Sequence, residues 1–387
     1  MTGGLMGGPL GGVIAFLLVV LAITASNLIA MRNLGSYPAP ANRPRVSVLI
    51  PVRDEGNNIH ACLTSLLAQD YAGYEVLVLD DDSHDDTAEI VERLSQDDPR
   101  LRLLRGASLP EGWIGKHWAC HQLSLQATGD LLLFTDADTR HDRRSLSDAV
   151  AALEAEGADL LTAIPRQEVV TWGERLVVPL LPWAIFTLVP VVLAHRWPRL
   201  PLSAAIGQFM LFRREAYDRT GGHSAVRCQA VDDLALARRT KAKGFRWRMV
   251  IGVDRVTCRM YRGLHEAAAG LSKNLFAVFD CRILPFLFVW LWMVHVFVVP
   301  PILAFVAWPA GMLSSETASQ ALTATVLAWC VWVLAYARLR IPARLGLLAP
   351  LTILIAVFLA FRSLGLTLSG SAKWKGRTLV RPEVKWV

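Results

Sequence analysis

Hydrophobic and polar residues follow two different patterns along this chain. Over residues 45–165, short apolar runs alternate with stretches whose apolar residues recur at helical spacing. The apolar runs are predicted to be buried strands, and they lie at 45–52, 74–80, 101–106, 130–136 and 158–165. Strands that are apolar throughout and alternate with helices indicate a parallel sheet covered on both faces, so the predicted fold class is α/β.

Four long segments carry no Asp, Glu, Lys or Arg, and they lie at 1–31, 283–313, 319–337 and 345–361. Each is near the roughly 20 residues that cross a bilayer as a helix. The first lacks a basic start and is too long for a cleaved signal peptide, so we expect a retained anchor. The predicted order is an N-terminal transmembrane anchor with linker, a soluble domain, a C-terminal transmembrane region and a basic tail, at 1–44, 45–282, 283–372 and 373–387.

The distribution of positive charge predicts the side on which the soluble domain lies. Arg32, Arg43 and Arg45 follow the first apolar segment, and no basic residue precedes it. The positive-inside rule therefore places the domain in the cytoplasm of a multi-pass protein of the inner membrane. Three further spans would put the basic tail outside, although its charge favours the inside. Because Arg362 cuts the last apolar run short, that run is expected to be re-entrant or interfacial, with a cytoplasmic tail.

Composition agrees with a membrane protein and excludes other classes. Of 387 residues, 53% are hydrophobic and only 19% are charged, and the formal net charge is +7. Basic residues next to the membrane, which attract anionic headgroups, explain this charge. No basic stripe is interleaved with aromatic residues, so nucleic acid is not an expected partner. The six cysteines lack metal-ligand spacing and are expected to be free thiols.

Acidic residues follow three of the predicted strands at their carboxyl ends. The first strand is followed by "RDE" (53–55), the second by "DDDSHDDT" (80–87) and the fourth by "DAD" (136–138). Ligands of such sheets bind at the carboxyl ends of the strands. Asp85 and Asp86 have an alternative role as helix caps. Three acidic segments at one edge would repel one another unless a cation or a hydroxyl-rich ligand lies among them.

These motifs resemble family 2 glycosyltransferases with the GT-A nucleotide-sugar fold. The resemblance covers about residues 45–275 and rests on the order and spacing of "LIPVRDEGNNI", "VLDDDSHDDT", "GK", "DAD", "GQFMLFRREAYDRTGG" and "VDDLALARRTKAKG". The strings "GWIGKHWA", "RMYRG", "GLSKNLF" and "WKGR" resemble the membrane branch that acts on lipids, including hopanoid-associated, carotenoid and, more distantly, ceramide glycosyltransferases. The expected architecture is a GT-A, Rossmann-like domain with N-terminal and C-terminal transmembrane helices.

The resemblance implies a divalent metal and a nucleotide-sugar donor. Asp136 and Asp138 would hold Mg or Mn, for which oxygen ligands are suited, with Asp138 the more direct ligand. The metal would stabilise the departing diphosphate of a UDP-sugar. Lys116 would neutralise diphosphate charge, and Asp136 also counts among the donor-binding residues. The alternative for Lys116 is a solvated lysine at a helix start.

By the same resemblance, Glu55 and Asp81 would meet the ribose and uracil, and Pro51 belongs to the same donor-binding motif. Inversion at the anomeric carbon needs a general base for the acceptor hydroxyl. Asp233, in "VDDLALARR", is the expected base, and Asp232 is the next candidate. Either could instead cap a helix, whose dipole favours acids at its start. The second-strand motif has no assigned role for Asp82.

The apolar segment 175–197 contains three prolines. If it crossed the membrane, the predicted metal and base motifs would lie on opposite sides. It is therefore expected to lie in the interface or to roof the site, where a lipid acceptor could enter. The alternative is a pair of ordinary buried helices.

The predicted function is transfer of one hexose, expected to be glucose, from a UDP-sugar to a lipid hydroxyl by an inverting glycosyltransferase. The acceptor class is a carotenoid, a hopanoid or a ceramide-like lipid within the bilayer. Polymerisation is disfavoured because the chain has no QxxRW string. Two alternatives stay open, which are a polyprenyl-phosphate glycosyltransferase and a non-catalytic membrane scaffold.

Overall fold

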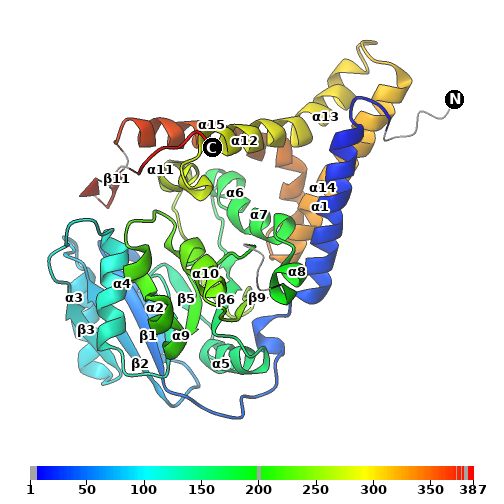
Figure 1. Ribbon diagram of the computed structural model, residues 1–387. Helices are drawn as coiled ribbons and strands as arrows, with labels where there is room; N and C mark the ends of the chain where they lie inside the picture. The colour runs from blue at the N-terminus through cyan, green and yellow to red at the C-terminus, as the bar shows by residue number, and fades with distance from the viewer. Residues whose placement is uncertain (1–6, 198–201, 372, 376, 379–381) are drawn as a thin grey trace.

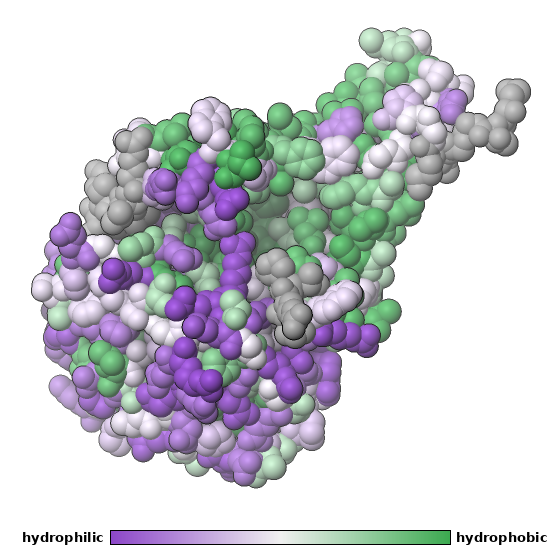
Figure 2. Space-filling view, viewed as in Figure 1, coloured by the Kyte–Doolittle hydropathy of each residue, from purple (hydrophilic) through white to green (hydrophobic). Residues whose placement is uncertain are grey.

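The computed structural model describes residues 7–197, 202–371, 373–375, 377–378 and 382–387. A rounded α/β domain lies against a group of long helices that extend away from it (Figure 1). The surface of the domain is largely hydrophilic, whereas the extended helices carry a hydrophobic surface (Figure 2). This contrast divides the molecule into a water-facing part and a part suited to lipid.

A seven-stranded sheet forms the centre of the α/β domain. Its strands, in spatial order, are β3 (Leu101–Arg105), β2 (Tyr74–Asp80), β1 (Val46–Val52), β4 (Leu131–Phe134), β8 (Met210–Arg213), β6 (Leu160–Ile164) and β9 (Trp247–Ile251). The α/β class predicted from the alternating pattern is confirmed. The strands predicted over residues 45–165 run parallel to one another, but the sheet also contains β8, which was not predicted and runs antiparallel to both β4 and β6. β8 has only four residues, too few to show a period of its own.

Alternate residues of the central strand β1 pack into two separate cores. Val48 and Ile50 belong to one core, which is covered by α2 (Gly56–Leu67), α3 (Thr87–Asp97) and α5 (Ser145–Ala155). Leu49 belongs to the other, which is covered by α4 (Gly115–Gln126), α9 (Arg214–Thr220) and α10 (Asp232–Ala242). Successive side chains of a strand point to opposite faces, so a wholly apolar strand is buried on both.

Within the described residues, four helices are long and apolar enough to cross a membrane: Gly11–Ala30, Ile283–Ala307, Ser315–Arg338 and Ala343–Leu368. They comprise α1 (Gly11–Ala30), α12 (Ile283–Phe297) with α13 (Val299–Ile302), α14 (Ser315–Arg338) and α15 (Ala349–Leu368). α1 and α14 run side by side in the same direction. The backbone N–H of Leu10 lies 3.4 Å from Oε1 of Gln320 at one end, and Arg338 donates to the Met31 carbonyl at the other.

The helix α15 differs from the other three because it lies along the α/β domain (Figure 1). Just after α14, Arg340 forms an ion pair with Asp254 of the domain. Leu359, in the middle part of α15, packs against α6 (Trp172–Val177) and α11 (Leu264–Asn274). Near the end of α15, the hydroxyl of Ser363 accepts a hydrogen bond from the Phe276 N–H at 3.0 Å. The second half of this helix is therefore held at the domain.

The proline-containing segment 175–197 forms short helices: the end of α6, α7 (Leu180–Leu188) and α8 (Val191–Arg196). Its side chains pack on the long helices, as Trp183 stacks on Trp332 of α14 with ring centroids 4.0 Å apart. Asn27 of α1 donates to the carbonyls of Phe186 and Val189. The segment is a bracket between the domain and the helices, and it does not form one continuous helix.

Two smaller sheets complete the structure. β5 (Thr139–His141), β10 (Val256–Cys258) and β7 (Arg166–Gln167) form a three-stranded sheet directly after the "DAD" motif. β11 (Lys373–Trp374) and β12 (Arg377–Thr378) form a hairpin in the tail. The tail also returns to the start of α12, where Ile283 donates to the carbonyl of Lys385.

Candidate functional site

The carboxyl ends of β1, β2 and β4 meet at one edge of the sheet, which we call the acidic edge. Glu55 is the residue before α2, Asp81 follows β2, and Asp136 and Asp138 follow β4. β1 lies between β2 and β4, so these residues are brought to the same edge. Pro51 lies within β1, paired in register with Leu79. The edge therefore holds the acidic residues that the sequence placed after separate strands.

Lys116 lies against the acidic edge and contacts the first aspartate of the "DAD" motif. Its Nζ donates to Oδ1 of Asp136 at 2.6 Å, and both side chains are about one quarter exposed. Lys116 is in the first turn of α4, where the helix dipole disfavours a cation. The Asp136 carboxylate offsets this cost. Lys116 is thus held at the site and is not a freely solvated lysine.

Asp138 has the surroundings expected of a metal ligand. Its Oδ1 is buried and has no hydrogen-bond partner among the described residues. Burial, followed by the charges of Asp136 and Glu55, raises the pKa of Asp138 to about 7. Two adjacent carboxylates in this state would be stabilised by a divalent cation. The residues present therefore fit a metal ion.

The protein would supply only part of the coordination of such an ion. Within the described ranges, no group of three or more His, Cys, Asp and Glu side chains is placed to hold a metal. Mg binds through one or two carboxylates, with phosphate oxygens and water as further ligands. Asp136 and Asp138 match that requirement.

Asp233 lies at the start of α10, facing the same space as Lys116. Its Oδ2 accepts the N–H of Gly207 at 2.9 Å, and its Oδ1 accepts the N–H of Leu234 at 2.7 Å. Burial, and then the charge of Asp232, raise the pKa of Asp233 to about 7. A carboxylate with this pKa can accept a proton near neutral pH.

The carboxylate of the neighbouring Asp232 faces two histidines. Its Oδ2 lies 3.7 Å from Nε2 of His117 and 3.6 Å from Nε2 of His223. Nδ1 of His117 faces the carbonyl of Arg227 at 3.2 Å, so Nδ1 carries a proton, because a carbonyl can only accept. Burial raises the pKa of Asp232, but His117, His223 and Lys116 outweigh burial and hold it well below its usual value. Asp232 is therefore a buried anion, unsuited to accept a proton.

Gly207 marks the space between the two halves of the site. A Cβ at this position would lie 3.6 Å from Oδ2 of Asp233 and 3.6 Å from Nζ of Lys116. Asp233 and Lys116 thus lie close together, both next to Gly207. The sequence predicted both sets of residues, and the structure brings Lys116, Asp136 and Asp233 together.

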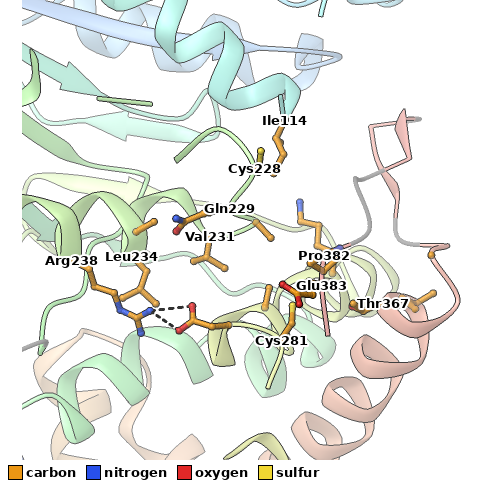
Figure 3. Close-up of a pocket in the computed structure, with 17 residues that line it drawn as sticks. Ile114, Cys228, Gln229, Val231, Leu234, Arg238, Cys281, Thr367, Pro382 and Glu383 are labelled. Carbon is orange, nitrogen blue, oxygen red and sulfur yellow. Dashed lines mark hydrogen bonds and ion pairs between the residues drawn. The ribbon is translucent and has the colours of Figure 1, made fainter. Parts of the chain in front are cut away.

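A pocket of about 270 Å³, which we call the α10 pocket, lies at the start of α10 (Figure 3). Val231 and Leu234, which flank the aspartate pair, line one wall. Leu366 and Thr367 at the end of α15 line another, and the tail contributes Pro382. The pocket therefore lies between the end of α15 and the residues that flank Asp233 in the chain.

The walls of the α10 pocket also carry charged groups. Arg238 donates to both carboxylate oxygens of Asp280 at 3.3 Å, drawn as dashed lines in Figure 3. Lys273 of α11 lines the pocket. Burial, and then the charge of Lys116, lower the pKa of Lys273 to about 8. Two cations, Arg238 and Lys273, and two anions, Asp280 and Glu383, therefore line the pocket.

Several residues of the site have no signal in the sequence alone. His117 and His223 are far apart in the chain, and only folding places them on Asp232. Lys273 and Lys375 lie in "GLSKNLF" and "WKGR", which were noticed as family strings without assigned roles. Lys375 proves to contact Glu55 at 2.8 Å.

Comparison with known proteins identifies the family of this domain. Residues 47–221 match the family model Glycosyl transferase family 2. The chain is 27% identical over 237 residues to the 4,4'-diaponeurosporenoate glycosyltransferase of Staphylococcus haemolyticus, covering 59% of this chain and 60% of that relative. It is 34% identical over 120 residues to Glycosyltransferase AglE of Haloferax volcanii, covering 30% of this chain and 38% of AglE. The matched parts thus span 60% or less of these relatives.

A solved structure shares the fold. The mannosyltransferase PcManGT from Pyrobaculum calidifontis, determined with GDP-Man and Mn2+, superposes with a TM-score of 0.51. The two chains are 20% identical, and the match covers 89% of this chain and 98% of the other. Together with the acidic edge and the matched family model, this shows that the chain carries a GT-A domain of glycosyltransferase family 2.

Proposed function

We propose that the protein is a metal-dependent, inverting glycosyltransferase that moves a single hexose, expected to be glucose, from a UDP-sugar to the hydroxyl of a membrane lipid. The observation that supports this most strongly is the position of Asp233. This carboxylate, with a pKa of about 7, lies close to Lys116 at the acidic edge, and the residues that flank it in the chain line a pocket next to the end of α15. The site therefore has room for a donor on one side and a lipid acceptor on the other.

The residues of the site divide the chemistry between them. Asp136 and Asp138 would hold the metal, which supplies Lewis-acid stabilisation of the leaving diphosphate. Lys116 adds a positive charge beside Asp136. Asp233 takes the proton of the acceptor hydroxyl as it attacks. Because Asp232 faces two histidines, only the carboxylate of Asp233 is left to accept a proton at this position. A single such carboxylate supports a single displacement with inversion.

We place the domain and the tail on the cytoplasmic side of the membrane. α1, α12 with α13, and α14 serve as the spans, whereas α15 lies at the membrane surface. Contacts of Leu359 and Ser363 with the same domain support this arrangement. Its outward residues, including Leu351, Leu354 and Phe358, are exposed and apolar, as expected for contact with lipid. Three spans leave the tail on the side of the domain, so its charge no longer conflicts with the count.

A lipid with an anionic end is the second candidate acceptor. Lys273 in the α10 pocket favours it, because a lysine ammonium can pair with a phosphate or carboxylate. Such an acceptor is already ionised and needs no strong base.

The substitution Asp233→Asn tests the main proposal. Asparagine keeps the size of the side chain but cannot take a proton, so turnover onto a lipid alcohol should fall by about 10²–10⁴. UDP and metal binding should survive, because they depend on the acidic edge. In the parent, the rate onto an alcohol should rise with pH through about 7, as Asp233 loses its proton. In the variant this rise should disappear.

The exposed Asp218→Asn is the matched control and should behave as the parent. Radiolabelled transfer onto a lipid alcohol and onto a lipid phosphate separates the two acceptors. A large loss with the alcohol alone supports the base. Near-normal transfer to the lipid alcohol by Asp233→Asn would refute the assignment of Asp233 as the base. If transfer to the lipid phosphate is then also nearly normal, the anionic acceptor is favoured.

A further inference from the structure

The hairpin of the tail brings a lysine onto the acidic edge from a distant part of the sequence. Nζ of Lys375 donates to Oε1 of Glu55 at 2.8 Å and to the Asp54 carbonyl at 3.0 Å. Arg53 donates in turn to the carbonyl of Lys375 at 3.3 Å. Figure 1 shows this hairpin, in dark red, above the blue and cyan part of the domain. The contact links the C-terminal tail to a predicted donor-binding residue.

The backbone at Lys375 is in a conformation that lysine rarely adopts. Its φ is +45°, and it follows β11 at the turn of a hairpin whose register pairs Trp374 with Arg377. Two-residue hairpin turns favour Asn, Asp or Gly at such positions. Unfavourable backbone conformations persist where the surroundings require the residue, and they are frequent at functional sites. The turn alone does not explain a lysine here.

The position of Lys375 also complements the charge of the edge. On the Asp136 side a cation is already present, because Lys116 contacts Asp136 at 2.6 Å. On the Glu55 side the cation is Lys375, whose side chain is 30% exposed and can turn towards a ligand. The charges of Lys116, Asp136 and Lys375 all act on the buried Lys273, so these groups share one electrostatic neighbourhood.

We infer that Lys375 is a donor-binding residue, whose ammonium contacts the diphosphate of the nucleotide sugar when the donor is present. In the absence of a donor, its ion pair with Glu55 keeps the hairpin on the edge. The inference rests on the proposed function for the class of donor, a nucleoside diphosphate sugar. In the opposite role, Lys375 would block Glu55 through the same contact and weaken donor binding. The two roles predict opposite changes in affinity.

The test is calorimetric titration of the full-length protein with UDP, and with uridine, in the presence of Mn. Lys375→Asn suits the turn and removes the charge, so the hairpin should survive. UDP binding should weaken about 10- to 100-fold, the usual worth of a hydrogen bond to a charged group. Uridine, which has no phosphate, should bind as it does to the parent. Lys375→Arg should restore much of the UDP affinity.

The matched control is Lys385→Asn, which removes an exposed cation of the same tail whose partner is Glu383. It should leave UDP binding unchanged. Tighter or unchanged UDP binding by Lys375→Asn would overturn the inference, as would an equal loss for UDP and uridine, which indicates a structural role. A parent protein that binds no UDP at all would instead contradict the proposed function.

Discussion

The acidic edge and the α10 pocket both lie near Asp233 but are built from different parts of the chain. The edge comes from the ends of three strands, β1, β2 and β4. The pocket comes from helices and from the tail, and its walls include residues of α10, α11 and α15. One surface is fixed by sheet register, whereas the other depends on how distant segments pack.

Their charges differ in the same way. At the edge, Asp138 has a buried oxygen without a partner among the described residues, so the edge is incomplete without a cation. In the pocket, Arg238 is already paired with Asp280. One half of the site therefore requires a cation, whereas the charged side chains on the walls of the other half balance one another.

The largest expected effect comes from breaking the edge with Asp138→Ala. Loss of a metal ligand removes several kcal/mol of stabilisation, so transfer should fall by about 10³-fold or more. Calorimetry with UDP should show that Mn no longer strengthens binding. No hydrogen-bond partner of Oδ1 among the described residues is left behind, so the metal-free protein should unfold at nearly the parent temperature.

Asp97→Ala, at the exposed end of α3, is the control for this experiment and should keep the metal effect. If Mn strengthens UDP binding to Asp138→Ala as much as to the parent, Asp138 does not bind the metal.

A smaller effect is expected from filling the pocket with Ala277→Phe. Ala277 lines the pocket, and a phenyl ring there competes with the lipid. Overpacking of this kind costs roughly 1–3 kcal/mol, so KM for the lipid should rise about tenfold. UDP binding should not change, because the edge is untouched. Ala277→Ser is the matched control with nearly the same volume, and a KM unchanged by Phe would place the acceptor elsewhere.

No effect on activity is expected from Ser371→Cys. This substitution tests whether the acidic edge and the α10 pocket lie on the same side of the membrane. The tail contacts the edge through Lys375 and the pocket through Pro382. A membrane-impermeant maleimide should therefore label the introduced thiol only in inverted vesicles. The exposed native Cys228 of the domain is the internal reference and should react from the same side. Labelling of position 371 in intact cells, with Cys228 protected, would show that α15 crosses the membrane.

The edge could be predicted from sequence because its signals are local. Each apolar run ends in acids, and parallel strands place such ends together. β8 was not predicted, because its four residues are too few to show a periodic pattern. Its direction is reversed because the chain leaves the sheet in the segment before β8. Asp232 and Asp233 are adjacent in the chain, so the sequence pattern could not tell which of them is the base. In the structure, two histidines from distant parts of the chain contact Asp232 and so distinguish the two roles.

The pocket could not be predicted, because no local pattern announces it. Lys375 and Glu55 are brought together only after α15 has turned back along the domain. The sequence indicated that the last apolar run was unusual, through Arg362, but hydropathy alone does not distinguish a crossing helix from one held at a surface. That distinction depends on contacts such as Ser363 with Phe276.

One hydrophobic core runs without a break from the sheet into the long helices. It includes Leu49 of β1, Trp183 of the bracket, and Leu17 and Trp332 of α1 and α14. A continuous core does not hinge easily, because packed interiors resist deformation. The distance of Asp233 from the long helices is therefore fixed by the fold. If these helices span a bilayer, as proposed, that distance decides which acceptors react, because an oxygen buried deep in the bilayer, or carried far beyond its surface, would not reach the carboxylate.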